Sequence, residues 1–218
     1  MPKYKLVCFD VDGTLVDNVK FSWQIFHDYF ETDKHRREDA KNAFFSGKIT
    51  YKQWAEHDIS LWKECNAKKQ DFYRAMKDLK LMNGAMETLK ELKKNKIKLA
   101  VISGSLNIIL EKFIPNYEEF FDDVFISRIY FGEEGYITEI DATEYDMDGK
   151  ALALKKITDK EKIKLDECVF VGDYLNDIKI MQEAGLGIAF NCIHDELKQV
   201  ADVVTEKKDL REILKYIL

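Results

Sequence analysis

The sequence lacks long apolar runs, paired cysteines, repeats and an excess of basic residues. No apolar run approaches the roughly 18 residues of a membrane span, and Met1-Pro2-Lys3 leads directly into an apolar segment without a signal-peptide core. The four cysteines are scattered, with no Cys-x-x-Cys pair. We therefore expect a reduced, cytoplasmic protein that has no membrane partner.

The charge balance excludes one class of partner. The formal net charge is −6, whereas binding to a nucleic-acid backbone needs a basic face. We therefore expect no nucleic-acid partner, but a small phosphorylated metabolite remains compatible, because a few local cations or a metal can hold it. A length of 218 residues suits one medium α/β domain with a smaller accessory one.

An apolar segment near the start, Leu6–Phe9, predicts a buried strand with two acids directly after it. Residues two apart in a strand point the same way, so Asp10 and Asp12 are expected to converge. Two carboxylates so close repel unless a cation or a shared proton relieves them. A simple Asp-Gly turn is the alternative. A calcium loop of the EF-hand type fits worse, because Gly13 is the fourth residue and Phe21 the twelfth.

Helical patterns replace strands between Asp17 and about Lys80. Trp23, Phe26 and Phe30 recur at helical spacing, and residues 46–48 and 65–67 resemble breaks between helices. We expect these aromatic side chains to form packing contacts, with a role in lining a substrate pocket as the alternative.

Strands and helices alternate after residue 84, which predicts an α/β fold with a doubly wound parallel sheet. The expected domains are an α/β core, residues 1–16 and 81–218, and a helical cap, residues 17–80. Strands are expected at 97–102, 124–126, 168–171 and 186–190, with a hairpin at 128–138, an edge strand at 203–204 and a closing helix at 210–218.

Polar residues follow several of these strands, at the edge where such sheets bind ligands. They are Asp10, Asp12, Ser103 and Asp173, with Asn176 and Asp177 shortly afterwards. Ser103, Asn176 and Asp177 could instead be only helix caps. Clustered carboxylates in a chain with four histidines suit Mg²⁺. Ser103 beside a helix N-terminus would bind an anion, so the combination predicts phosphate chemistry.

Four motifs resemble those of the haloacid dehalogenase (HAD) superfamily, in their order, and in particular its phosphoserine phosphatase-like branch. They are Asp10-Val11-Asp12-Gly13-Thr14, Ser103, Lys150 and Gly172-Asp173-Tyr174-Leu175-Asn176-Asp177. The resemblance covers essentially the whole chain, including the helical cap, and implies an Mg²⁺-dependent phosphatase.

The resemblance also implies roles for the residues. Asp10 would attack phosphorus to give an aspartyl-phosphate, and Asp12 would act as general acid and base. The remaining implied roles are phosphate binding by Ser103, Gly104 and Lys150, metal binding by Asp10, the Asp12 carbonyl and Asp173, and orientation of these groups by Asn176 and Asp177. Lys150 on its own would more commonly be a surface lysine.

Two departures from the branch concern the substrate. Val19 stands where phosphoserine phosphatases have a Glu, and Asp58 lies near the position of their cap Arg. The loss of a bidentate partner for a carboxylate disfavours phosphoserine, so we expect a different small phosphomonoester. The alternatives are a phosphoserine phosphatase, a phospho-accepting signalling module and a non-catalytic binding module. The signalling module fits poorly because its phosphorylated Asp lies in mid-chain and it needs no cap, and intact Asp10, Asp12 and Asp173 argue against the binding module.

Overall fold

A seven-stranded sheet forms the centre of the protein, and the computed structural model describes residues 3–218. The strand order is β6-β5-β4-β1-β7-β8-β9. All neighbours are parallel except β5 and β6, which pair antiparallel. The strands are β1 (Leu6–Phe9), β4 (Lys98–Leu106), β5 (Asp123–Phe131), β6 (Ile137–Asp141), β7 (Cys168–Gly172), β8 (Leu186–Phe190) and β9 (Val203–Thr205). The predicted α/β sheet is confirmed.

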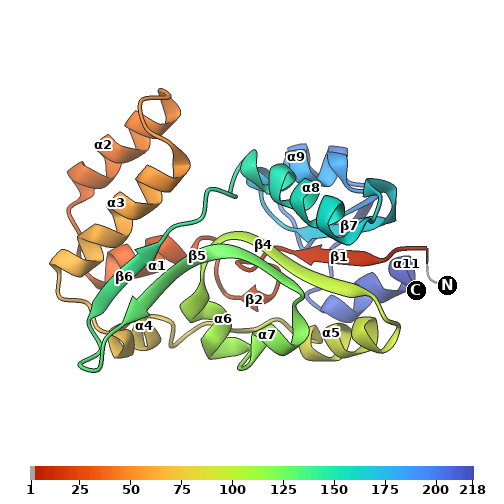
Figure 1. Ribbon diagram of the computed structural model, residues 1–218, viewed down its shortest axis with the longest axis horizontal. Helices are drawn as coiled ribbons and strands as arrows, with labels where there is room; N and C mark the ends of the chain where they lie inside the picture. Colours follow the sequence, from red (N-terminus) through yellow and green to blue (C-terminus); the bar gives the residue numbers. More distant parts are fainter. Residues whose placement is uncertain (1–2) are drawn as a thin grey trace.

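Helices cover both faces of this sheet (Figure 1). One layer contains α5 (Ala85–Lys94), α6 (Asn107–Phe113), α7 (Tyr117–Phe120) and α11 (Leu214–Ile217), and the other contains α8 (Gly149–Glu161), α9 (Ile178–Glu183) and α10 (Asp195–Val200). Short 3₁₀ turns occupy Leu165–Glu167, Leu175–Asp177 and Leu210–Ile213. Alternate side chains of β1 point to opposite layers: Val7 and Phe9 join one buried cluster, and Leu6 and Cys8 join the other.

The central position of β1 explains why its end can serve as a site. It pairs with β4 on one side and β7 on the other, and all four of its residues are buried. The backbone N–H of Asp10 continues the pairing by donating to the Val171 carbonyl at 3.0 Å. The carboxyl ends of β1 and β7 therefore lie side by side where Asp10 begins the next loop, and β4 continues past them.

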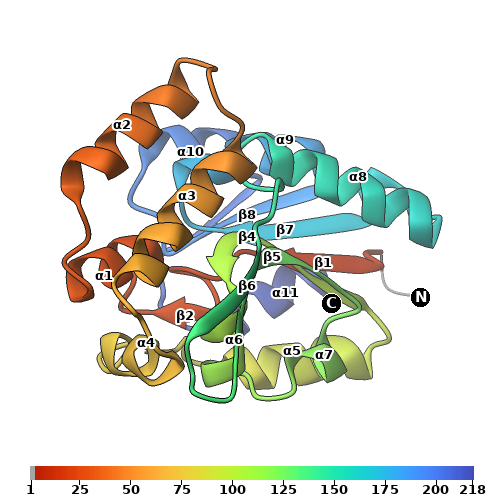
Figure 2. The ribbon, with the colours of Figure 1, turned by 60° about the vertical axis from the view of Figure 1, so that its left-hand side comes forward.

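Four helices lie between two short strands, β2 (Val16–Asp17) and β3 (Lys80–Leu81), which pair antiparallel. We call residues 18–79 the cap segment. Its helices are α1 (Ser22–Tyr29), α2 (Lys34–Phe45), α3 (Tyr51–Glu64) and α4 (Lys69–Ala75). They lie beside the end of the sheet toward which β1 points (Figures 1 and 2). The predicted breaks after Phe45 and Glu64 are confirmed.

Aromatic packing holds these helices together. The ring centroids of Trp23 and Trp62 are 5.1 Å apart, and those of Phe26 and Phe72 are 5.0 Å apart. All four side chains are nearly or fully buried. The prediction that these aromatic residues form packing contacts is confirmed for Trp23 and Phe26.

Two predicted boundaries are wrong. The strand expected at 97–102 continues as β4 to Leu106, because Leu106 still pairs with Ser127 of β5 beyond a register shift. The strand expected at 124–126 and the first arm of the hairpin are a single strand, β5, which bends from one partner to the other. The expected edge strand is present as β9. No helix within residues 3–218 is long and apolar enough to cross a membrane.

Candidate active site

Asp10 is the first residue after β1 and is 5% exposed. One carboxylate oxygen accepts a hydrogen bond of 2.8 Å from the Val11 backbone N–H. The other lies 3.2 Å from the ammonium nitrogen of Lys150. The backbone and the lysine thus fix the orientation of this carboxylate at the end of the central strand.

Lys150 lies in the first turn of α8 and is fully buried. Its ammonium donates to Asp177 at 2.6 Å and lies 3.9 Å from Asp146. Burial lowers the pKa of this lysine, but the surrounding carboxylates outweigh that effect and raise the pKa above its ordinary value. Lys150 is therefore a permanently charged group in the interior rather than a surface lysine.

Asp12 has a different environment from Asp10. Its two carboxylate oxygens accept hydrogen bonds from the Ser22 backbone N–H at 2.7 Å and from the Ser105 hydroxyl at 2.9 Å. Burial is the main cause that raises the pKa of Asp12 to about 6, and the neighbouring charge of Asp10 adds to it. A carboxyl group with this pKa can both give and take a proton near neutral pH.

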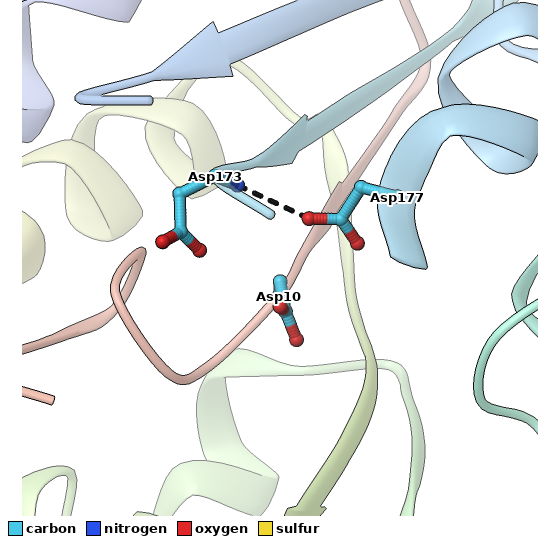
Figure 3. A group of neighbouring side chains, drawn as sticks. All are labelled: Asp10, Asp173 and Asp177. Atoms are coloured by element: carbon cyan, nitrogen blue, oxygen red, sulfur yellow. Dashed lines mark hydrogen bonds between the residues drawn. The ribbon is translucent and has the colours of Figure 1, made fainter. Parts of the chain in front are cut away.

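Asp173 and Asp177 complete a group of acids around Asp10 (Figure 3). One carboxylate oxygen from each of the three residues lies within 4.8 Å of the others. Burial and the charge of Asp10 raise the pKa of Asp173 well above its ordinary value. Two hydrogen bonds fix the orientation of the Asp177 carboxylate. It accepts them from the backbone N–H groups of Asp173 at 3.1 Å and Tyr174 at 3.2 Å.

The donor set around Asp173 fits a hard divalent cation. All of the donors are oxygens, and a bound cation would offset both the burial and the repulsion by Asp10 that raise the pKa of Asp173. Gly13 leaves room for this carboxylate: its φ is +76°, and a Cβ at this position would overlap the Asp173 side chain. The Asp12 carboxylate, by contrast, is not in this group.

The reason expected for anion binding by Ser103, a position beside a helix N-terminus, is wrong. The helix that follows begins only at Asn107, so Ser103 belongs to β4 and does not lie at a helix N-terminus. Its hydroxyl oxygen accepts from the Ser105 backbone N–H at 3.2 Å. The Gly104 carbonyl accepts from the Trp23 indole N–H at 2.8 Å, which ties this strand end to the cap segment.

The family is evident from comparison with known proteins. Residues 4–185 match the family model described as "Hydrolase: haloacid dehalogenase-like hydrolase". The chain belongs to this family.

The relatives of this HAD hydrolase narrow the resemblance to one branch. It is 34% identical to the phosphoserine phosphatase of Methanocaldococcus jannaschii over 99% of this chain and 98% of the relative. It is 28% identical to that of Campylobacter jejuni over 98% and 99% of the two chains. The solved structure of a substrate-bound phosphoserine phosphatase complex superposes with a TM-score of 0.75 at 33% identity, covering 100% of both chains.

Val19 and Asp58, the two residues that depart from the branch, are both buried in this HAD hydrolase. Val19 is an 8% exposed apolar side chain. Asp58 is 3% exposed and lies 3.1 Å from the His27 ring and 3.3 Å from the His57 ring. Asp58 is therefore satisfied within the cap segment.

Several residues beside the predicted site had no signal of their own in the sequence. Ser22, Ser105, Asp146 and Tyr51 are the main ones. Ser105 could have been found, because it lies two residues beyond Ser103 in an extended segment. The other three approach from loops and from the cap segment, so only the folded chain brings them together.

Proposed function

We propose that this HAD hydrolase is an Mg²⁺-dependent phosphatase that hydrolyses a small phosphomonoester through an aspartyl-phosphate on Asp10. The observation that carries the proposal is the Asp10 carboxylate, held between a backbone N–H and a fully buried lysine 3.2 Å away. A carboxylate oriented in this way can attack phosphorus, while the lysine balances the negative charge of the phosphoryl oxygens.

The chain's own residues divide the remaining work. Asp10 bonds to phosphorus as the alkoxide leaves, and Asp12 gives its proton to that oxygen. Asp12 then takes a proton from a water molecule whose oxygen bonds to phosphorus. The bond between phosphorus and Asp10 breaks, so inorganic phosphate leaves and Asp10 returns as a free carboxylate. Lys150, Ser103 and Gly104 bind the phosphoryl oxygens, because charge spreads over these oxygens in the transition state.

A magnesium ion would be held by Asp10, Asp173 and the backbone carbonyl of Asp12. When bound, it neutralises charge on the phosphate and on the clustered acids. Asp177 and Asn176 orient the surrounding groups: Asp177 holds Lys150 at 2.6 Å. We also propose that residues 1–16 and 81–218 act as the core and that residues 17–80 act as a cap over the substrate.

The substrate is a small phosphorylated metabolite, and the relatives bear on which one. Their names favour phosphoserine, the alternative, over the expectation from sequence that phosphoserine is not used. Val19 and Asp58 still provide no cation for the carboxylate of phosphoserine. Phosphoserine is therefore the candidate that the relatives favour, and it is the first compound to test in a substrate panel.

The test is hydrolysis of p-nitrophenyl phosphate with and without Mg²⁺. We expect activity that is lost on chelation and restored by Mg²⁺. A ³²P-labelled substrate should also label the protein covalently, and this label should be stable in acid and removed by hydroxylamine. The label should be absent from Asp10→Asn. Activity that survives both chelation and this substitution would reject the proposed mechanism.

A further inference from the structure

Asp146 is a third carboxylate beside the buried lysine of the site. It precedes α8 and is 5% exposed. One of its oxygens lies 3.9 Å from the Lys150 ammonium, which also pairs with Asp177 at 2.6 Å and with Asp10 at 3.2 Å. In the part of the chain that the structure describes, Lys150 is the only cationic side chain within ion-pair distance of Asp146. One positive charge is therefore shared among three negative ones.

The same Asp146 oxygen accepts a hydrogen bond of 2.8 Å from the Asn176 side-chain amide. The carbonyl oxygen of that amide is buried without a hydrogen-bond partner among residues 3–218, so the contact with Asp146 is the one that orients Asn176. A neutral acceptor, such as the amide oxygen of an asparagine, could accept the same hydrogen bond. The contact with Asn176 therefore explains an oxygen at this place, but not a negative charge.

The negative charge of Asp146 is costly to bury. A carboxylate loses its hydration in the interior, and the other two acids beside Lys150 repel it. One ammonium cannot neutralise three carboxylates, so the group as a whole stays negative without a metal. A charge that opposes folding in this way is better explained by an effect on the site than by stability.

Asp146 also lies close to the proposed phosphoryl site. A phosphoryl oxygen bound to Lys150 would lie within about 7 Å of the Asp146 oxygen, because a hydrogen bond spans about 3 Å and the lysine is 3.9 Å away. The second Asp146 oxygen lies against Gly104, where a Cβ would overlap it. Asp146 thus contacts two of the residues proposed to bind phosphate, and charges at such distances in a poorly solvated site interact strongly.

We propose that the negative charge of Asp146 acts through Lys150 to weaken the binding of phosphate, so that the product leaves instead of inhibiting the enzyme. This inference rests on the proposed phosphatase function, in which Lys150 binds the phosphoryl oxygens. Asp146 touches no reacting atom in this scheme. The same charge strengthens the binding of Mg²⁺ at Asp10 and Asp173, because it attracts a cation as it repels an anion.

The test measures the binding of orthophosphate and of Mg²⁺ by isothermal titration calorimetry. Asp146→Asn removes the charge, keeps nearly the same shape and leaves an oxygen that can accept from Asn176. The dissociation constant for orthophosphate at saturating Mg²⁺ should fall by about tenfold. The dissociation constant for Mg²⁺ without phosphate should rise by about threefold, a smaller effect because Asp146 does not itself hold the metal. Damage to the packing would weaken both, so opposite shifts identify the charge.

Asp148→Asn is the matched control. It removes the same charge two residues away, from a side chain that is 84% exposed and paired with Lys179 at 3.3 Å. Both dissociation constants should stay within about twofold of wild type, because solvent and salt screen an exposed charge. Asp146→Ala is the second variant. It removes the acceptor for Asn176 together with the charge, and it should show the same two shifts as Asp146→Asn.

Unchanged or weaker binding of orthophosphate in the Asp146 variants would overturn the inference. So would tighter binding in Asp146→Ala alone, which would assign the effect to the release of Asn176. Failure of both variants to fold would also contradict it, since the charge would then serve stability. Hydrolysis of p-nitrophenyl phosphate is measured in parallel. An inactive wild type would reject the proposed function, whereas an active wild type with any of these results would reject only the role of Asp146.

Discussion

The end of the central sheet and the cap segment both bury acids, but they satisfy these acids in opposite ways. Asp10 and Asp173 lie among other carboxylates, and Lys150 is the one lysine that reaches the cluster in the described chain. Asp58 of the cap segment lies 3.1 Å from the His27 ring, in a packed aromatic environment. Burial lowers the pKa of His27 and thus favours its neutral ring. A buried acid alone is thus a poor indicator of chemistry, whereas unrelieved repulsion between several acids is a good one.

The largest contrast is expected from Asp10→Asn. This substitution removes the proposed nucleophile, so kcat for p-nitrophenyl phosphate should fall by about 10³-fold or more. The melting temperature of the metal-free protein should not fall, because one of the repelling charges is lost. A variant that retains a tenth of the activity would show that Asp10 is not the reacting group.

Lys150→Met should destabilise the metal-free protein, because it removes the positive charge beside the buried carboxylates. Without the ammonium, Asp10 and Asp177 remain buried and uncompensated, so the free energy of unfolding without metal should fall by about 3–5 kcal/mol. Urea unfolding measures this change. Millimolar Mg²⁺ should restore part of the loss in the variant, and a stability equal to that of wild type would contradict the description of Lys150 as the balancing charge.

The pH dependence of stability sharpens the role of Asp12. Its pKa of about 6 in the folded protein lies above the ordinary value of 3.8, so folding favours its protonated form. Protonated Asp12 therefore adds about 3 kcal/mol to the free energy of unfolding. This stabilisation is fully present below pH 4 and is lost as the pH rises through 6. The contribution of Asp12 is isolated by comparing the free energies of unfolding of metal-free wild type and Asp12→Asn from pH 4 to 7. Parallel curves would show that the pKa of Asp12 is not raised.

The smallest effect is expected for Asp58→Asn in the cap segment. An amide can still hydrogen-bond to the neutral His27 ring, so the free energy of unfolding should change by about 1 kcal/mol or less. The rate with p-nitrophenyl phosphate should stay within about threefold of wild type. A loss as large as that of Asp10→Asn would place Asp58 in the reaction and remove the contrast between the two regions.

Most of the sheet and its polar end could be predicted from the sequence, since both follow from local patterns. The apolar run of Leu6–Phe9 and the acids after it locate β1 and Asp10. The acids after β7 are predicted near Asp10 because parallel neighbours end at one edge. The resulting group of Asp10, Asp173 and Asp177 is present in the structure.

The remaining features depend on contacts between distant segments. The strand β4 continues through Ser103 and Gly104 because β5 pairs with Leu106, and no local preference indicates this. The ribbon of β2 and β3 is too short to produce an alternating pattern. Asp146 and Tyr51 come together only when a loop and a helix more than ninety residues apart in the chain fold over Gly104.

The ribbon formed by β2 and β3 has a consequence for how such a protein can change. Val16 pairs with Leu81 and Asp17 with Lys80, so both ends of the inserted helices leave the core side by side. The inserted helices therefore start and end at neighbouring points, like the loop of a hairpin. The entropic cost of bringing the two ends of a loop together grows only slowly with the length of the loop. A different set of helices, or a simple turn, could therefore replace this one by recombination while β1 and its acids stay in register, so the inserted helices can be exchanged without moving Asp10.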